Sequence, residues 1–122
     1  RSNEHYASRA LELLAKEEKL LNGSDLADLL TPNFQEIAEN GALLTREMKL
    51  QASSNLSVLT ESSSALTESN FAIQAYHAQQ VSKKTFILTY DYLVQQKRIR
   101  VTSIWRRNDE WLCLYRQLTP HL

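Results

Sequence analysis

The sequence has few of the residues that carry several common functions. Its 122 residues include one cysteine, two glycines, two prolines and three histidines. A single cysteine, Cys113, excludes an internal disulfide, and two glycines are too few for a glycine-rich phosphate loop. The histidines lie far apart, without the spacing of a metal site. We therefore expect no cofactor and no metal.

Net charge and long apolar runs are also lacking. Fourteen basic residues balance fourteen acidic ones, so the chain has no global field to hold nucleic acid or an anionic membrane. No apolar run approaches the ~18 residues of a membrane-spanning helix. We expect neither partner. The lone thiol lies in an apolar strand pattern, which suits a buried cysteine in a reducing, cytoplasmic compartment.

The N-terminal third of the chain has helical periodicity. Its length and 43% hydrophobic content fit one domain over residues 1–122. Apolar residues recur every three to four positions over residues 7–21, and charged residues, Glu17 among them, occupy much of the rest. Gly23 supplies a stop signal. The pattern predicts a first helix that ends there and a second, short helix over residues 25–30.

A strand and a third helix are predicted next. Residues 34–39 fit a strand in which Phe34, Glu36 and Ala38 share one face. The pair Asn40-Gly41 predicts a tight turn. Thr45 can cap a helix over residues 46–59, and the Ser-rich stretch 60–69 is expected to be a loop.

From residue 70 onward, the pattern is that of four antiparallel strands joined by tight turns. Alternating residues predict one shared face on each strand. These sets are Phe71, Ile73, Ala75 and His77; Phe86, Leu88, Tyr90, Tyr92 and Val94; Ile99, Val101, Ser103 and Trp105; and Trp111, Cys113, Tyr115 and Gln117.

The opposite faces of these strands are apolar as well, where a solvated face would be polar. The helices can cover only one side of the sheet, so a second copy of the chain is the simplest cover for the other. We expect a homodimer through this sheet face. The apolar residues concerned are Ile87, Leu93, Ile104, Leu112 and Leu114.

Two motifs resemble a known family. Leu30-x-Pro32-x-Phe34-x-Glu36, followed by Gly41 and Arg46-Glu47, resembles the opening of domain of unknown function 4440. The ending resembles that family's close: Ser103-Ile104-Trp105-Arg106-Arg107, Trp111, then Gln117-Leu118-Thr119-Pro120. The resemblance implies an α+β fold of the nuclear transport factor 2-like superfamily. This is a cone of strongly curved antiparallel sheet with three N-terminal helices packed in its concave side. The superfamily includes isomerase-like and dehydratase-like enzymes, ligand-binding proteins and associative domains.

Five residues are candidates for a pocket in such a cone. Glu36 could act as a general base, or form a structural salt bridge with Arg46 or Arg116. His77 could be an acid or base, or simply be exposed. Tyr90 or Tyr92 could stabilise an oxyanion, or fill the core. Trp105 is expected to be a structural anchor at the pocket.

Five of the fourteen basic residues gather in one stretch near the C-terminus. They flank the third strand of the predicted meander, where cations protect an exposed strand edge from aggregation. We interpret this stretch as a solvated edge rather than a surface for single-stranded nucleic acid. Its members are Lys97, Arg98, Arg100, Arg106 and Arg107.

Two functions remain open from the sequence. One is a non-catalytic domain that binds a small apolar ligand or serves in association. The other is a cofactor-free isomerase, dehydratase or cyclase with Glu36 or His77 as the base. The first is favoured because no base and oxyanion donor are paired by their spacing.

Overall fold

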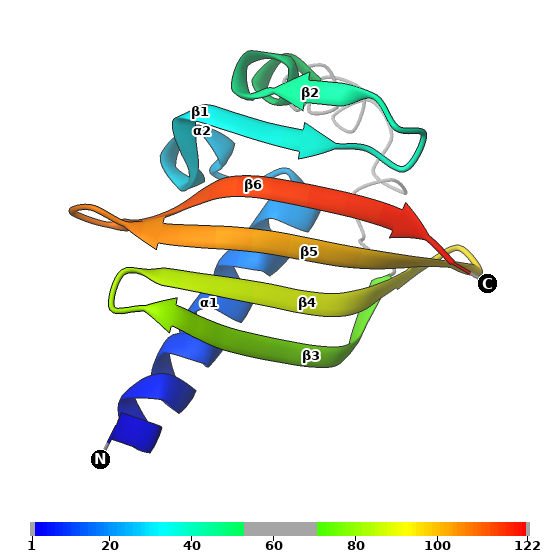
Figure 1. Cartoon of the computed structure of the whole chain (residues 1–122). Helices are drawn as coiled ribbons and strands as arrows, with labels where there is room; N and C mark the ends of the chain where they lie inside the picture. The colour runs from blue at the N-terminus through cyan, green and yellow to red at the C-terminus, as the bar shows by residue number, and fades with distance from the viewer. Residues whose placement is uncertain (1, 53–70, 122) are drawn as a thin grey trace.

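A long helix lies across a curved six-stranded sheet in the computed structural model, which describes residues 2–52 and 71–121 (Figure 1). The strand order is β2-β1-β6-β5-β4-β3. The elements are α1 (Ser2–Asn22), α2 (Leu26–Leu29), β1 (Leu30–Ile37), β2 (Leu43–Thr45), β3 (Phe71–Ser82), β4 (Thr85–Val94), β5 (Lys97–Arg107) and β6 (Trp111–Pro120).

The four C-terminal strands form the predicted antiparallel meander. β1 joins this meander by pairing in parallel with β6, and β2 pairs antiparallel with β1 on the outside. The parallel ladder is irregular between Leu30 and Gln35, where Pro32 has no N–H to donate. Beyond it, Glu36 lies opposite Arg116. Topology therefore brings together two charged residues that are far apart in the sequence.

The N-terminal elements largely follow the sequence signals. Gly23, with φ 73°, ends α1, and the Ser24 N–H donates to the Lys19 carbonyl at 2.8 Å. α2 is shorter than predicted. β1 begins at Leu30, directly after α2, so the predicted strand 34–39 starts four residues too late.

The Asn40-Gly41 turn leads into β2, a three-residue strand that the sequence did not predict. Thr45 Oγ1 then accepts the Met48 N–H at 3.3 Å, which is the expected cap for the helical residues 46–52. The rest of the predicted third helix, and the predicted loop 60–69, lie outside the described residues.

Two bulges reverse the side-chain alternation. In β3 the register steps from Gln74–Asp91 to His77–Thr89, and Ala75 at the step has φ 55°. Tyr76 consequently faces α1 while His77 is exposed. The prediction that Ile73, Ala75 and His77 share one face is therefore wrong, because a bulge adds one residue to the strand.

The bulge in β6 has the opposite consequence, since it brings a residue inward. The register steps from Ile104–Tyr115 to Trp105–Cys113, so Leu114 is the extra residue. Arg116 thereby joins Cys113 among the buried residues. Tyr115 lies opposite Ile104 of β5, on the other face of the sheet. The predicted shared face of Cys113 and Tyr115 is wrong for the same reason.

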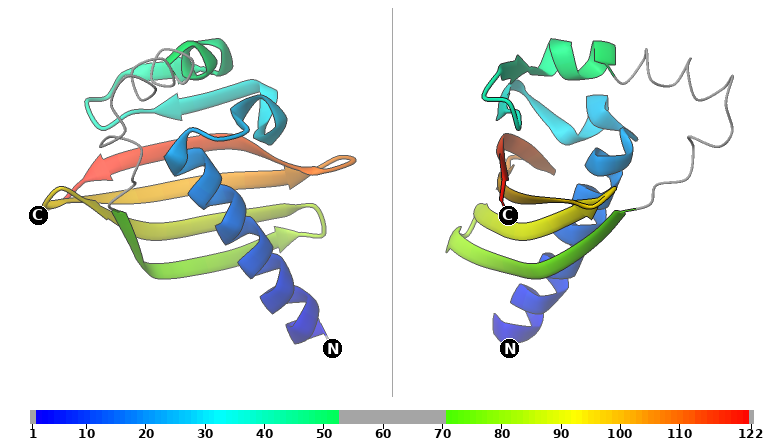
Figure 2. Two further views of the ribbon diagram at one scale, coloured as in Figure 1. Left: turned by 180° about the vertical axis from the view of Figure 1, so that it is seen from behind. Right: turned by 90° about the vertical axis from the view of Figure 1, so that its right-hand side faces the viewer.

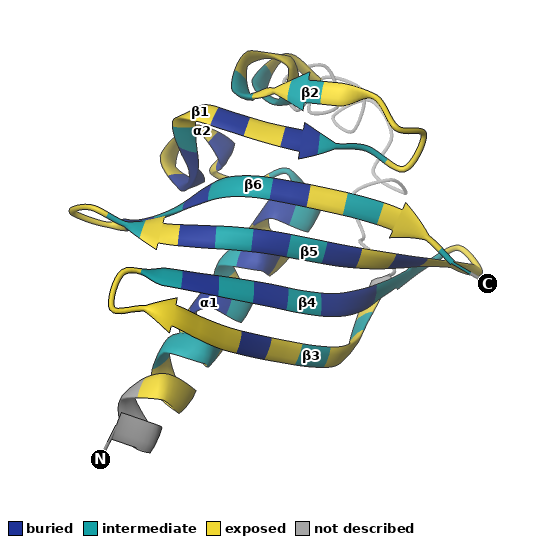
Figure 3. Cartoon of the chain, in the orientation of Figure 1, coloured by how far each residue is buried: buried dark blue, intermediate teal, exposed yellow. Residues whose placement is uncertain are grey.

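The core lies between α1 and the concave face of the sheet (Figures 2 and 3). α1 contributes Leu13 and Leu20, which pack against inward residues of β4, β5 and β6. A second cluster of buried residues continues toward the β4–β5 turn and comprises Tyr90, Ile99 and Val101. Among residues 2–52 and 71–121, no helix has both the length and the hydrophobicity to cross a bilayer.

Candidate functional site

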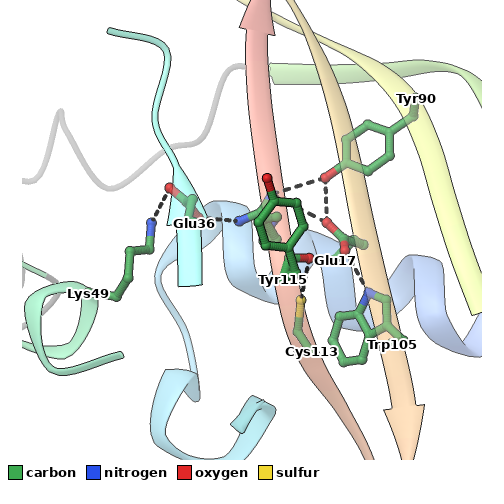
Figure 4. Close-up of polar contacts among 8 residues, drawn as sticks. Glu17, Glu36, Lys49, Tyr90, Trp105, Cys113 and Tyr115 are labelled. Atoms are coloured by element: carbon green, nitrogen blue, oxygen red, sulfur yellow. Dashed lines mark hydrogen bonds and ion pairs between the residues drawn. The ribbon is translucent and has the colours of Figure 1, made fainter. Parts of the chain in front are cut away.

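A fully buried carboxylate in α1 is the centre of a polar cluster inside the core. Glu17 lies one turn after Leu13 and one turn before Leu20, so helical geometry places it on the face that packs against the sheet. Its side chain has no solvent exposure. Tyr90 Oη donates to Oε1, and Trp105 Nε1 donates to Oε2 at 2.7 Å (Figure 4). Each carboxylate oxygen thus has a partner from the sheet.

The guanidinium of Arg116 lies beside this carboxylate and is only 2% exposed. Its Nη2 is 3.3 Å from Glu17 Oε1 and donates to Tyr90 Oη at 3.2 Å. Its Nη1 is 3.6 Å from Glu36 Oε1. Burial acts to lower the pKa of Arg116, but the negative charges of Glu17 and Glu36 outweigh it and raise the pKa above its ordinary value. The cation is thereby held between two carboxylates.

Glu36 is the outer end of the cluster, and it is 2% exposed. Lys49 Nζ, from the helical residues 46–52, donates to Oε2 at 3.1 Å. Among the described residues, Oε1 accepts no hydrogen bond. The predicted salt bridge with Arg116 is present, whereas Arg46 donates to the Ala27 carbonyl at 2.9 Å instead.

A pocket adjoins Glu36 at the end of β1. It has a volume of about 400 Å³ and is lined by Glu36, Ala38, Glu39, Asn40 and Leu118. A second pocket of about 480 Å³ also has Glu39 in its lining, which makes the two neighbours. Its remaining lining residues are Gln96, Lys97, Arg98, Ile99, Pro120 and His121.

The buried tyrosines are held as neutral hydrogen-bond donors. Burial, followed by the charge of Glu17, raises the pKa of Tyr90 and also that of Tyr76. Tyr76 Oη donates to the Ala10 carbonyl at 2.6 Å, so β3 and β4 both bond to α1 through tyrosines. The hydroxyl proton of Tyr90 is directed at Glu17.

The five predicted pocket residues do not all come together. Glu36, Tyr90 and Trp105 belong to one connected cluster through Glu17 and Arg116. Tyr92 is half-buried against the cluster of Tyr90, Ile99 and Val101, and burial raises its pKa. His77 is exposed on the outer face, because the β3 bulge turns it away from α1.

Sequence reasoning missed two members of the cluster, which are Glu17 and Lys49. Glu17 was grouped with the charged residues of the first helix, although its spacing from Leu13 and Leu20 places it on the apolar stripe. Arg116 was predicted only as one of two possible partners of Glu36, and its burial depends on the β6 bulge. For Lys49 no signal was available, because its partner lies on another element. In the described part of the chain, no three His, Cys, Asp or Glu side chains are grouped as a metal site.

Comparison with known proteins finds neighbours only among solved structures. No protein-family model matches the chain, and no curated protein matches it either. The resemblance to domain of unknown function 4440 is thus not confirmed. An NTF2-like protein of unknown function in nutrient uptake from Rhodospirillum rubrum has a TM-score of 0.65 at 16% identity, covering 94% of this chain and 98% of that one.

Two further structures cover most of the chain. A putative ketosteroid isomerase from Parabacteroides distasonis has a TM-score of 0.66 at 13% identity, with 89% of this chain and 85% of that one covered. The CamKII hub homology domain of Chlamydomonas reinhardtii has a TM-score of 0.70 at 15% identity, with 93% and 99% covered. At these identities the likeness concerns the fold alone. The chain has the nuclear transport factor 2-like fold, with a curved, unclosed sheet of six strands and helices N-terminal to it.

Proposed function

We propose that the chain binds a small molecule that has an apolar body and a hydrogen-bond donor, and that the donor approaches Glu36. The observation that carries this proposal is the buried Oε1 of Glu36, which accepts no hydrogen bond among the described residues and belongs to a residue that lines a pocket. A buried acceptor without a donor lowers the stability of the fold by about 1–3 kcal/mol. A ligand hydroxyl or amine N–H at Oε1 would recover that free energy.

The surroundings of Glu36 support a ligand of modest size. The two neighbouring pockets, of about 400 and 480 Å³, lie within the range of small-molecule sites. Ala38 and Leu118 provide apolar surface in the first, and Ile99 and Pro120 do so in the second. An apolar body in these pockets and a donor at Glu36 would together fix the orientation of the ligand.

The geometry favours binding over turnover. An isomerase of this kind needs a base and a donor aimed at the developing oxyanion. The O–H of Tyr90 and the N–H of Trp105 both donate to Glu17. Glu36 is paired with two cations, Arg116 and Lys49. Both protons already have an acceptor inside the protein, and Glu36 already faces two cations.

The alternative function is a cofactor-free isomerase, dehydratase or cyclase with Glu36 as general base. One observation favours it: Glu36 is the carboxylate of the cluster that also lines a pocket. A neighbour in fold is named a putative ketosteroid isomerase. The exposed position of His77 on the outer face removes it from this mechanism.

A thermal-shift screen with matched ligand pairs tests the proposal. Each apolar alcohol or amine, including hydroxysteroids, is compared with the ketone of the same skeleton. Saturating binding raises the apparent stability by mass action. We expect the alcohols and amines to stabilise the protein more than the ketones. Equal shifts for both members of every pair, or no shift at all, would overturn the role of Glu36 as acceptor.

Variants and a turnover assay complete the test. Glu36→Gln carries both an acceptor and a donor, so the preference for alcohols should disappear. Glu47→Gln, an exposed change on the neighbouring helical residues 46–52, should keep the preference. Consumption of any stabilising ketone by the wild type, abolished in Glu36→Gln, would support the enzymatic alternative.

We also propose that two copies pair through the outer face of the sheet. Among the described elements, no helix lies over this face, since α1 crosses the other one (Figures 1 and 2). Half-buried apolar side chains gather there, namely Ile87, Leu93, Ile104, Leu112 and Leu114. We expect a dimer by sedimentation at micromolar concentration, dissociated by Ile104→Lys. A wild-type monomer would sink the proposal.

A further inference from the structure

Another, smaller cavity lies near the start of α1, at the end of the strands opposite to the pockets near Glu36. It measures about 110 Å³ and involves the β3–β4 turn, the end of β5 and the start of β6. No residue of its lining is shared with the two pockets near Glu36. Its lining contains three cations and no carboxylate: Tyr6, Arg9, Gln80, Lys83, Phe86, Arg107 and Trp111.

The indole of Trp111 organises this cavity. Its side chain is 5% exposed, and Phe86 packs edge-on against it with ring centroids 5.6 Å apart. The guanidinium carbon of Arg9 lies 5.1 Å from the centroid of the indole ring, and that of Arg107 lies 6.0 Å from it. Both distances are within the reach of a cation–π interaction. The ring thus holds two cations at one cavity.

Two buried donors on residues that line this cavity have no acceptor among the described residues. Trp111 Nε1 and Arg107 Nε are inaccessible to solvent and form no hydrogen bond within the described part of the chain. Buried N–H groups are nearly always paired, so two such groups on adjoining lining residues indicate a missing acceptor. A water or an anion could supply it after a small shift of the lining side chains, and the charge of the surroundings decides between them.

The charge balance favours an anion. Arg9 is paired with Glu12, but Lys83 and Arg107 form no ion pair with any described residue. Asp109 and Glu110, in the adjoining β5–β6 turn, are exposed and do not line the cavity. Lys83 and Arg107 therefore lack a carboxylate partner among the described residues, and Arg107 also carries one of the two unpaired donors.

We propose that this cavity binds a tetrahedral oxyanion, namely a phosphate group that is either inorganic or part of a small monoester. A cavity volume of about 110 Å³ has room for a phosphate group. Arginine side chains recognise phosphate through charge-assisted hydrogen bonds. The prediction of a solvated strand edge is wrong, because β5 lies between β4 and β6 inside the sheet. Arg107 belongs to this site, while Arg98, Arg100 and Arg106 are exposed.

The two tryptophans provide a direct test with an internal reference. In a ¹⁵N NMR spectrum the chain has two indole N–H signals, because it contains only Trp105 and Trp111. The Trp105 N–H already donates to Glu17 and should not respond. Titration with inorganic phosphate, and separately with phenyl phosphate, should shift the Trp111 signal saturably. Sodium chloride of matched ionic strength should leave it in place.

Variants assign the effect to the cavity. Lys83→Gln and Arg107→Gln should each weaken phosphate binding about ten-fold, which corresponds to about 1.4 kcal/mol. Lys84→Gln, at the adjacent exposed position outside the lining, should bind like the wild type. Lys83 lies in an exposed turn, so its variant decides the matter if Arg107→Gln does not fold.

The phosphate titrations can either support or overturn the proposed anion site. Tighter binding of phenyl phosphate than of phosphate supports the site with a monoester as its occupant, and equal binding supports it with free phosphate. A Trp111 signal that does not saturate, that responds equally to chloride, or that titrates equally in the wild type and Lys83→Gln overturns the proposal. Ligand binding near Glu36 is measured separately, so either proposal can fail alone.

Discussion

Glu17 and Glu36 are two buried carboxylates that both lie beside Arg116, and they differ in what else they touch. Glu17 accepts hydrogen bonds from the neutral donors of Tyr90 and Trp105, so both of its oxygens are satisfied. Glu36 is paired with cations, has one oxygen without a hydrogen bond among the described residues, and lines a pocket. Burial alone therefore does not distinguish a structural carboxylate from a candidate ligand-binding one. The two kinds of carboxylate differ in how many of their oxygens accept a hydrogen bond.

The largest effect is expected from Glu17→Gln. The change removes the charge that faces the buried Arg116 and leaves an amide N–H₂ against a donor of Tyr90 or Trp105. Breaking a buried pair in this way costs about 3–5 kcal/mol of unfolding free energy. Urea denaturation measures the loss, and Glu18→Gln on the exposed side of α1 should change stability by less than about 0.5 kcal/mol. Similar costs for the two variants would show that Glu17 is not the centre of the cluster.

A smaller loss of stability is expected from the matched change Glu36→Gln. Arg116 keeps its partner Glu17, and the pairs that are lost are the 3.6 Å contact with Arg116 and the bond from Lys49. We expect a cost of about 1–2 kcal/mol in urea denaturation, because one charged hydrogen bond is replaced by a neutral one. A cost equal to that of Glu17→Gln would remove the distinction between the two carboxylates.

Tyr90→Phe tests the Glu17 end through its pH dependence. Because the pKa of Tyr90 is raised in the folded protein, the neutral hydroxyl stabilises the fold fully below the ordinary tyrosine pKa of about 10. Above that pH the unfolded chain loses its proton while the folded one keeps it. The stabilisation therefore falls by up to about 1.4 kcal/mol per pH unit until the folded pKa is reached.

Denaturation midpoints on both sides of pH 10 measure this difference. The wild type should be more stable than Tyr90→Phe by about 1–3 kcal/mol at neutral pH, and the gap should narrow in alkaline solution. Tyr115→Phe is the control for loss of a tyrosine hydroxyl outside the cluster, since its Oη donates to Gln117 on an exposed part of β6. A gap that stays constant with pH would contradict the buried position of the Tyr90 hydroxyl.

The sequence was sufficient where the strands are regular. Alternation in β4 and β5 predicted correctly that Tyr90, Ser103 and Trp105 face inward, and the motifs indicated the fold that the solved structures confirm. The tight turn at Asn40-Gly41 and the helix stop at Gly23 were also predicted. These signals are local, so they survive without knowledge of the tertiary structure.

The sequence was insufficient where one residue interrupts the alternation. Bulges at Ala75 and Leu114 reverse the faces that follow them, so His77 was wrongly placed on one face with Ile73, and the burial of Arg116 was not predicted. Neither position carries glycine, whose presence would have signalled a bulge. The pairing of Glu36 with Arg116 was predicted only as an alternative to Arg46, because the parallel contact of β1 with β6 that selects Arg116 is encoded by no local pattern.

The smallest effect is expected from Lys49→Met, at the solvent side of the Glu36 end. The Lys49 side chain is 23% exposed, and partly exposed ion pairs contribute about 1 kcal/mol or less. Because Lys49 bonds Oε2 and the ligand donor is proposed to bond Oε1, the preference for alcohols over ketones should persist in this variant. Urea denaturation and the paired thermal-shift screen measure both quantities. A loss as large as that of Glu17→Gln would mean that Lys49 completes the cluster as firmly as Tyr90 and Trp105 do. The outer carboxylate would then be as structural as the inner one, and the case for a ligand at Glu36 would fail.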